Sequence, residues 1–174
     1  MGTGKSTVAW ELAQHFRIPC LDTDKLVEQR VGRTVREIFN ESGEPFFREV
    51  ESEVLRECLH SPGGAVIAAA GGVVLSETNR QLLDKARAKR MVTVVWLHAL
   101  PEVLAARTAK GSHRPALDTD RLQVLQQMYT QREPMYKEVS DVVIDVSERS
   151  VESVTSLIID AIDQAVIWED GVHE

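Results

Sequence analysis

The chain has 174 residues, 43% of them hydrophobic and 27% charged, which is the size and composition of one globular domain over residues 1–174. Its net charge of −7 excludes a general nucleic-acid binder, because phosphate backbones need a basic surface. The longest uncharged run, residues 61–76, is too short for a membrane helix. Cys20 and Cys58 fall in no metal-binding spacing, which indicates reduced thiols in a cytoplasmic protein.

Apolar spacing and turn residues divide the chain into alternating helices and strands. The first half predicts, in chain order, a helix over 6–17, a strand over 19–21, helices over 25–30, 34–42 (stopped by Gly43) and 44–59, and a strand over 65–69. The second half predicts a helix over 76–89, a doubly buried strand over 91–97, a helix over 101–108, a loop over 109–117, a helix from 118 or 119 to about 132, a strand over 142–146, and a final helix that opens at Ser150 and frays from Trp168. This order predicts an α/β fold with a mostly parallel sheet flanked by helices.

The first residues form the second half of a phosphate-binding loop, GxxxxGK[ST], which here reads Gly2-Thr3-Gly4-Lys5-Ser6-Thr7. Glycines let backbone N–H groups turn toward phosphates, and the helix that follows adds the positive end of its dipole. Lys5 is placed to reach the β- and γ-phosphates, and the Ser6 hydroxyl to bind Mg²⁺. The loop therefore predicts a nucleotide site that uses Mg²⁺.

The complete motif has another glycine three residues before Gly2, with a strand ahead of it. In a P-loop fold that strand lies in the middle of the sheet, and its loss would leave backbone groups unpaired on both neighbouring strands. We therefore expect the natural protein to begin roughly ten or more residues before Met1, with an apolar strand and the missing glycine.

Further motifs make the chain resemble the shikimate kinase family from Gly2 to about Val146. They follow the family's order and read Leu21-Asp22-Thr23-Asp24, Ile38-Phe39, Gly43-Glu44, Phe47-Arg48-x-x-Glu51, Gly71-Gly72, Asn79-Arg80, Arg107-Thr108, Arg114-Pro115 and Arg132-x-x-x-Tyr136-x-x-Val139. Two positions depart mildly from the pattern, Ala70 where the family has a third glycine and Ala116 where it has leucine. The resemblance implies a P-loop kinase fold with a substrate-binding region over about 23–60 and a mobile lid over about 109–117.

The resemblance also implies the reaction, which is transfer of the γ-phosphoryl group of MgATP to the 3-hydroxyl of shikimate, giving shikimate 3-phosphate and ADP in aromatic amino acid biosynthesis. Shikimate carries a carboxylate, which the planar guanidinium group of arginine binds bidentately. The family match assigns that contact to Arg48 and Arg132. Judged by its neighbours alone, Arg48 would be a surface ion pair with Glu44 or Glu51.

The remaining substrate contacts come from the same resemblance. Asp24 matches the residue that hydrogen-bonds the reacting side of shikimate, and it is the candidate to accept the hydroxyl proton. Gly71 and Gly72 would present backbone N–H groups to the substrate. Asp22 would orient waters on Mg²⁺, or it would simply cap the next helix.

Two further arginines complete the implied ATP site. Arg114 matches the lid arginine that meets the charge developing on the transferred group, so the implied catalytic residues are Lys5, Asp24 and Arg114. Arg107 resembles the residue that stacks on adenine. His113, next to the lid arginine, reads as a solvated loop residue.

Two alternatives stay open at this stage. Another small-metabolite P-loop kinase, such as a gluconate kinase, would share the loop but not the downstream motifs. A non-catalytic or truncated kinase-like protein would bind ligands without transferring a phosphoryl group. We expect the partners to be ATP and shikimate, with no nucleic acid or membrane, and the chain to act as a monomer in the cytoplasm.

Overall fold

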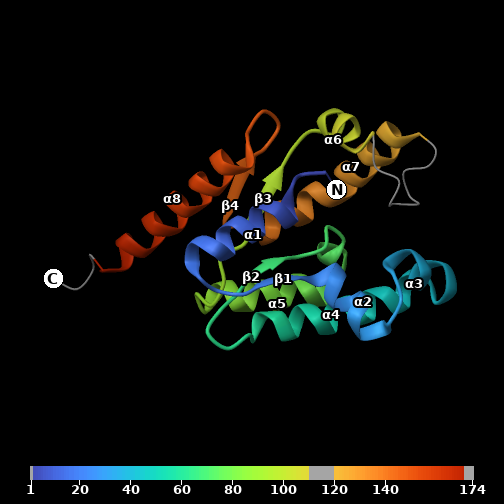
Figure 1. The fold of residues 1–174 in the computed structure, drawn as a ribbon, viewed down its shortest axis with the longest axis horizontal. Helices are drawn as coiled ribbons and strands as arrows, with labels where there is room; N and C mark the ends of the chain where they lie inside the picture. The colour runs from blue at the N-terminus through green and yellow to red at the C-terminus, as the bar shows by residue number, and fades with distance from the viewer. Residues whose placement is uncertain (1, 110–119, 171–174) are drawn as a thin grey trace.

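The computed structural model describes residues 2–109 and 120–170, with side chains described as far as residue 164 (Figure 1). The elements are α1 (Lys5–Phe16), β1 (Cys20–Asp22), α2 (Thr23–Val31), α3 (Val35–Glu41), α4 (Gly43–Leu59), β2 (Val66–Ala68), η1 (Val73–Leu75), α5 (Glu77–Ala88), β3 (Val95–His98), α6 (Pro101–Thr108), α7 (Arg121–Val139), β4 (Val142–Asp145) and α8 (Val151–Asp170). Helices and strands alternate as the sequence predicts, apart from the 3-10 helix η1, which no sequence pattern indicated.

Every strand pairing is parallel, but the described residues form two two-stranded sheets rather than one continuous sheet. In the first sheet β1 pairs with β2, so that Cys20 lies opposite Val66. In the second sheet β3 pairs with β4, so that His98 lies opposite Asp145. Among the residues that the structure describes, no strand pairs with the remaining edges of β2 and β3. The expectation of a further strand ahead of the phosphate loop stays a prediction.

Helix α1 lies between the two strand pairs in Figure 1 and is the centre of the largest core cluster. Its apolar residues Val8 and Leu12 are buried against α8, through Val154 and Ile158. Partly buried residues of both sheets pack on the same cluster, namely Val66, Val95, Leu97 and Ile144. One helix that starts in the phosphate loop therefore holds both strand pairs together.

Two further clusters build the part of the molecule over residues 23–60. One joins α2, α3 and α4 through Val27, Ile38 and Phe47. The other joins α4 to α5 and α7 through residues such as Leu55, Leu83 and Val139. Helix α4 belongs to both clusters, so it connects α2 and α3 to α5 and α7.

The predicted strand over 91–97 is too long, and it is not buried on both faces. Strand β3 begins at Val95, its residues are half-buried, and Met91 is 55% exposed. The reason is the length of its neighbour, because β4 begins only at Val142 and offers no partner to residues 91–93. The carbonyl of Val94 accepts the first bonds, from the N–H groups of Asp141 and Val142.

Two helices run further than the sequence predicts. Helix α7 continues past Arg132 and includes Pro134, although proline removes one helical hydrogen bond. The second half holds because Val139 is buried and Tyr136 bonds to another segment. Helix α8 extends past Trp168 to Asp170. None of the described helices is long and apolar enough to cross a membrane.

Candidate active site

The phosphate loop has the backbone that its glycines allow. Gly2 and Gly4 have φ angles of 76° and 80°, in the left-handed region that other residues rarely adopt. Helix α1 starts directly after Gly4, whose carbonyl accepts the N–H groups of Thr7 and Val8. The free N–H groups of the first helical turn therefore face the loop, as an anion site requires.

The side chain of Asp22 has two tasks at the end of β1. Its Oδ2 accepts the hydroxyl of Ser6 at 2.8 Å, and its Oδ1 accepts the N–H groups of Asp24 at 3.1 Å and Lys25 at 3.4 Å. Asp22 therefore caps α2, as one interpretation expects, and it also lies beside the predicted metal ligand, so its role toward Mg²⁺ stays a prediction. A hydroxyl next to a carboxylate fits Mg²⁺, which takes few protein oxygens and completes its shell with phosphate and water. Within residues 2–109 and 120–170, no group of three His, Cys, Asp or Glu could hold a metal alone.

Thr23 connects the start of α2 to the turn after β2. The sequence analysis assigned it no role. Its Oγ1 accepts the N–H of Ala70 at 2.8 Å, and its side chain is completely buried. This bond fastens the start of α2 to the turn that carries Gly71 and Gly72. Ala70 is accommodated at the family's glycine position because its φ is not positive.

Arg48 on α4 is held against that turn by two carboxylates. Its Nη1 donates to both oxygens of Glu51, at 2.8 and 3.0 Å, while Nε and Nη2 donate to Glu44 at 3.1 and 2.9 Å. A Cβ built on Gly72 would collide with the guanidinium group, so a larger residue there would have to displace Arg48 from its two carboxylates. The ion pairs therefore exist, and they fix the arginine at the glycine turn.

Glu51 is the residue that sequence reasoning most undervalued. It is fully buried, and burial raises the pKa of its carboxyl group while Arg48 opposes that rise. The signal was present in the sequence, since Glu51 lies four residues from both Phe47 and Leu55 on the apolar face of a helix. A charge on such a face indicates a buried ion pair.

Arg132 on α7 approaches the same turn from the other side. Its Nη1 lies 3.4 Å from the carbonyl oxygen of Gly71, and the Tyr136 hydroxyl donates to that oxygen at 2.5 Å. The Nε of Arg132 is buried and has no hydrogen-bond partner, and the side chain forms no ion pair with any residue that the structure describes. The structure therefore brings Arg48, Arg132, Gly71 and Gly72 together.

The other predicted ATP contacts are placed in part. Arg107 lies at the end of α6, where its Nη2 donates to the carbonyls of Val146 at 2.6 Å and Ser147 at 3.0 Å. Its guanidinium group thus lies beside the connection between β4 and α8. Arg114 and most of the predicted lid, residues 110–117, lie outside the described residues.

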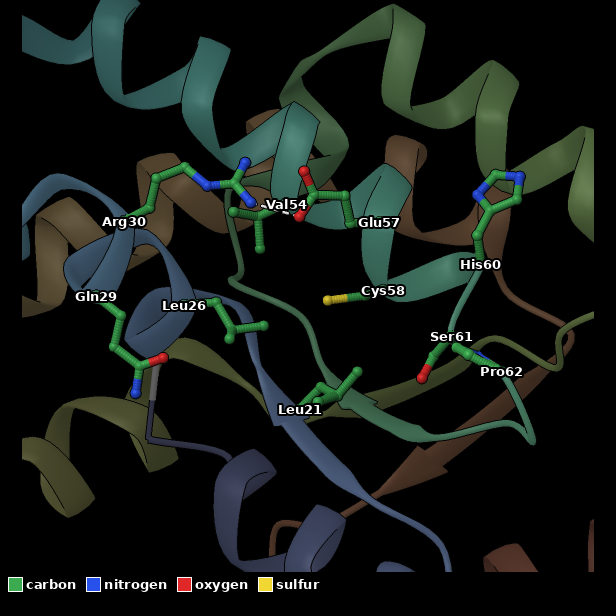
Figure 2. A pocket seen from close by; sticks show the side chains of 10 residues that line it. All are labelled: Leu21, Leu26, Gln29, Arg30, Val54, Glu57, Cys58, His60, Ser61 and Pro62. Carbon is green, nitrogen blue, oxygen red and sulfur yellow. Dashed lines mark hydrogen bonds and ion pairs between the residues drawn. The ribbon is translucent and has the colours of Figure 1, made fainter.

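A hollow of about 500 Å³ between α2 and α4 is not this site (Figure 2). It is lined by residues such as Leu26, Val54, Cys58 and His60, and by none of the predicted site residues. Arg30 is bonded to Glu57 across it, so its charge is already neutralised. Burial raises the pKa of the Cys58 thiol, which makes it a poor nucleophile. We assign the hollow no role.

Together, the loop and the two converging arginines define the class of protein. A phosphate loop that begins a helix is suited to a nucleoside triphosphate, and a second cationic site at the adjacent turn is suited to a small anionic acceptor. The fold and the site are thus those of a P-loop kinase that acts on a small molecule.

Comparison with known proteins identifies the family. The model of the family described as shikimate kinase matches residues 1–163. The chain is 42% identical to a shikimate kinase of Pseudomonas syringae pv. tomato over 150 residues, covering 86% of this chain and 84% of that protein. This chain belongs to the shikimate kinase family, whose members are ATP-dependent kinases that use Mg²⁺.

Solved structures agree with this assignment. The shikimate kinase of Acinetobacter baumannii in complex with shikimate superposes with a TM-score of 0.85 at 30% identity, covering 95% of this chain and 89% of that one. The shikimate kinase of Bacteroides thetaiotaomicron gives a TM-score of 0.82 at 26% identity, covering 94% of both chains. The predicted fold and family are confirmed, and the gluconate kinase alternative is set aside.

Proposed function

We propose that this chain phosphorylates the 3-hydroxyl of shikimate with MgATP, and that the observation carrying the proposal is the unpaired Arg132. A partly buried guanidinium group whose Nε is fully buried ordinarily has a carboxylate partner. Arg132 has none among the described residues, while Arg48 beside it is held in place by Glu44 and Glu51. A carboxylate brought by the substrate would supply the missing partner, and shikimate has one.

The shikimate molecule would then lie between the two arginines at the glycine turn and the phosphate loop at the start of α1. The turn at Gly71 and Gly72 is anchored to α2 through Thr23, and α2 also carries Asp24. The charges of Asp24 and Arg132 both act on the carboxyl group of Glu51, so both residues lie near it. We assign Asp24 to orient the reacting hydroxyl and accept its proton.

The phosphate half positions the donor. Backbone N–H groups from Gly2 to Ser6 would cradle the phosphates, with the Thr7 hydroxyl beside them and Lys5 on the β- and γ-phosphates. Mg²⁺, held by Ser6 and Asp22, would neutralise charge on those phosphates. Arg114 would close over the transferred group and Arg107 would contact adenine. Phosphoryl transfer depends mainly on positioning and charge stabilisation, which this arrangement supplies.

The test measures ADP release with purified protein, MgATP and three acceptors, which are shikimate, gluconate and a shikimate analogue without the carboxylate. Only shikimate is expected to be turned over rapidly. Arg132→Gln should raise the shikimate KM by about 30-fold or more, because it removes a charge-assisted contact. Lys85→Gln removes the same charge from an exposed position on α5 and should leave the KM unchanged. Shikimate binding without turnover would instead support the non-catalytic alternative, and equal use of gluconate would refute the carboxylate argument.

We also infer that the chain acts as one domain over residues 1–174 and as a monomer in the cytoplasm. Cys20 and Cys58 are both free thiols, which suits a reducing compartment. The substrate region 23–60 packs on helices of the same chain through α4. Sedimentation of the purified protein tests the monomer, and fractionation of the source cells tests the compartment.

A further inference from the structure

Two neighbouring polar residues in the first turn of α5 lie mostly buried beside η1. Asn79 is 1% exposed, and the side chain of Arg80 is 17% exposed. Both belong to the motifs that resemble the family, but neither is among the proposed contacts with shikimate or ATP. Side chains in the first turn of a helix point back toward the segment that precedes it, and here that segment is η1.

The two side chains donate hydrogen bonds to the carbonyl groups of η1. Nδ2 of Asn79 donates to the carbonyl of Val73 at 3.1 Å. Nη1 of Arg80 donates to the carbonyl of Val74 at 2.8 Å and lies 3.5 Å from that of Leu75. The last carbonyls of a helix have no partner inside it, and in a single 3-10 turn this applies to all of them. Because Val73 and Val74 are buried, their carbonyls depend on α5 for donors.

The 3-10 helix is bonded in turn to the glycine turn. The N–H of Val73 donates to the carbonyl of Ala70 at 3.1 Å, and the N–H of Leu75 donates to that of Gly72 at 3.0 Å. Glycines have no side chains to hold a turn in place, so its position is set by the segments on either side. Thr23 holds the N–H of Ala70 at one end, and η1 with α5 holds the other.

The position of this turn matters because two parts of the proposed shikimate site depend on it. Gly71 and Gly72 are proposed to present N–H groups to the substrate, and the guanidinium group of Arg48 packs directly on Gly72. The bond from Arg80 is the stronger of the two anchors, since hydrogen bonds from an ionised donor are stronger than neutral ones.

An ion pair with α7 is the competing role for Arg80. Its Nε lies 3.2 Å from Oε2 of Glu138, but this contact is not aligned as a hydrogen bond, and the Glu138 side chain is 60% exposed. Ion pairs with so exposed a partner contribute little. The Val74 carbonyl is therefore the main partner of Arg80.

We propose that Asn79 and Arg80 are positioning residues that hold the glycine turn, through η1, where shikimate binds. The inference rests on the proposed function, since it concerns the affinity for shikimate. Loss of either anchor should raise the dissociation constant and the KM for shikimate while kcat changes little, because the turn contacts the acceptor before transfer as well as during it. The KM for MgATP should stay the same.

The test compares wild type with Arg80→Met, Arg80→Lys and Asn79→Leu. Calorimetry gives the shikimate dissociation constants, ADP release gives KM and kcat, and urea unfolding gives the stability of each variant. Arg80→Met keeps the length of the side chain but no donor, so it should weaken shikimate binding about threefold to thirtyfold, the range for a residue that acts through others. Arg80→Lys keeps the charge and donors and should recover most of that loss. Asn79→Leu should act in the same direction as Arg80→Met, and the Arg80 variants decide the test if it does not fold.

Arg87→Met is the matched control for a general loosening of α5. Arg87 lies about two turns further along the same helix, and its side chain is similarly buried, at 21% exposed. It joins α5 to α7 through Asp141 at 2.8 Å and the Glu138 carbonyl at 3.1 Å, and among the described residues it bonds to no part of η1. Arg87→Met should lower the free energy of unfolding without changing the shikimate KM. Glu138→Gln removes only the ion pair of Arg80 and should leave the shikimate KM unchanged as well.

The outcomes are distinguishable. A wild-type chain that does not phosphorylate shikimate refutes the proposed function. An active wild type with unchanged shikimate affinity in Arg80→Met overturns the inference. An equal loss of affinity in Arg87→Met or Glu138→Gln also overturns it, because the cause would then be the packing of α5 on α7. A parallel rise in the KM for MgATP would do the same, since the effect would not be specific to the glycine turn.

Discussion

Replacing Arg48 by alanine tests the substrate half of the site most directly. Arg48 donates hydrogen bonds to both oxygens of Glu51, and the Glu51 side chain is only 1% exposed. The change therefore removes a substrate contact and, at the same time, leaves a buried carboxylate without its cation. The two effects have different magnitudes and can be separated.

The stability effect is the larger one in free energy. Removing one partner of a buried ion pair costs about 3–5 kcal/mol at neutral pH, which is a large fraction of the stability of a domain this size. The loss of a charged contact in the transition state costs a further ~2–4 kcal/mol, and this corresponds to a fall in kcat/KM of about 30-fold to 900-fold. Most of that fall should appear as a higher KM for shikimate.

The assay uses Arg48→Ala alone and combined with Glu51→Gln. Glutamine removes the unpaired buried charge, so urea unfolding should show the double variant to be more stable than the single variant by about 2 kcal/mol. ADP release should show that kcat/KM for shikimate stays low in both variants. The KM for MgATP serves as an internal control and should not change.

Recovery of activity together with stability would refute this reasoning, because Arg48 would then act only by balancing Glu51. The reasoning also fails if Arg48→Ala keeps kcat/KM within about threefold of wild type, which is less than the smallest charged contact would give.

Three other predictions follow from the site. Arg114→Ala should lower kcat far more than it raises the shikimate KM, because this cation stabilises charge that develops on the phosphoryl group during transfer. His113→Ala in the same loop is the control and should change neither value. Equal effects of the two variants would contradict the catalytic role of Arg114. Thr23→Val keeps the shape of the side chain but leaves the buried N–H of Ala70 without an acceptor. It should therefore lower the free energy of unfolding by about 1–3 kcal/mol and raise the shikimate KM. Thr23→Ser keeps the hydroxyl and should restore both values. Burial raises the pKa of Glu51 above its unfolded value of about 4.3, so the contribution of its protonated form to stability is complete below that pH and is lost as the pH rises through the folded pKa. Urea unfolding between about pH 4 and pH 7 should therefore show a smaller fall in the free energy of unfolding for Glu51→Gln than for wild type. An equal fall in both proteins would refute the assignment.

The sequence alone determined the parts of this protein that depend on neighbouring residues. The phosphate loop is one, because the glycines at positions 2 and 4 specify its backbone and Lys5 and Ser6 specify its ligand. The helices are another, since apolar spacing and capping residues act within a few positions, as α4 shows for the spacing and Ser76 at the start of α5 shows for the cap. The order of short motifs was enough to identify the family before any geometry was known.

Tertiary structure alone decided how those parts meet. Thr23 bonds to Ala70 across 47 positions, and Tyr136 bonds to Gly71 across 65, so no local pattern indicates either contact. The same holds for the length of β3, which depends on where β4 begins, and for α7, which continues through Pro134 because its second half packs elsewhere. Glu51 is the mixed case, visible in the sequence as a charge on an apolar helical face, but explained only when Arg48 folds against Gly72 and buries the pair.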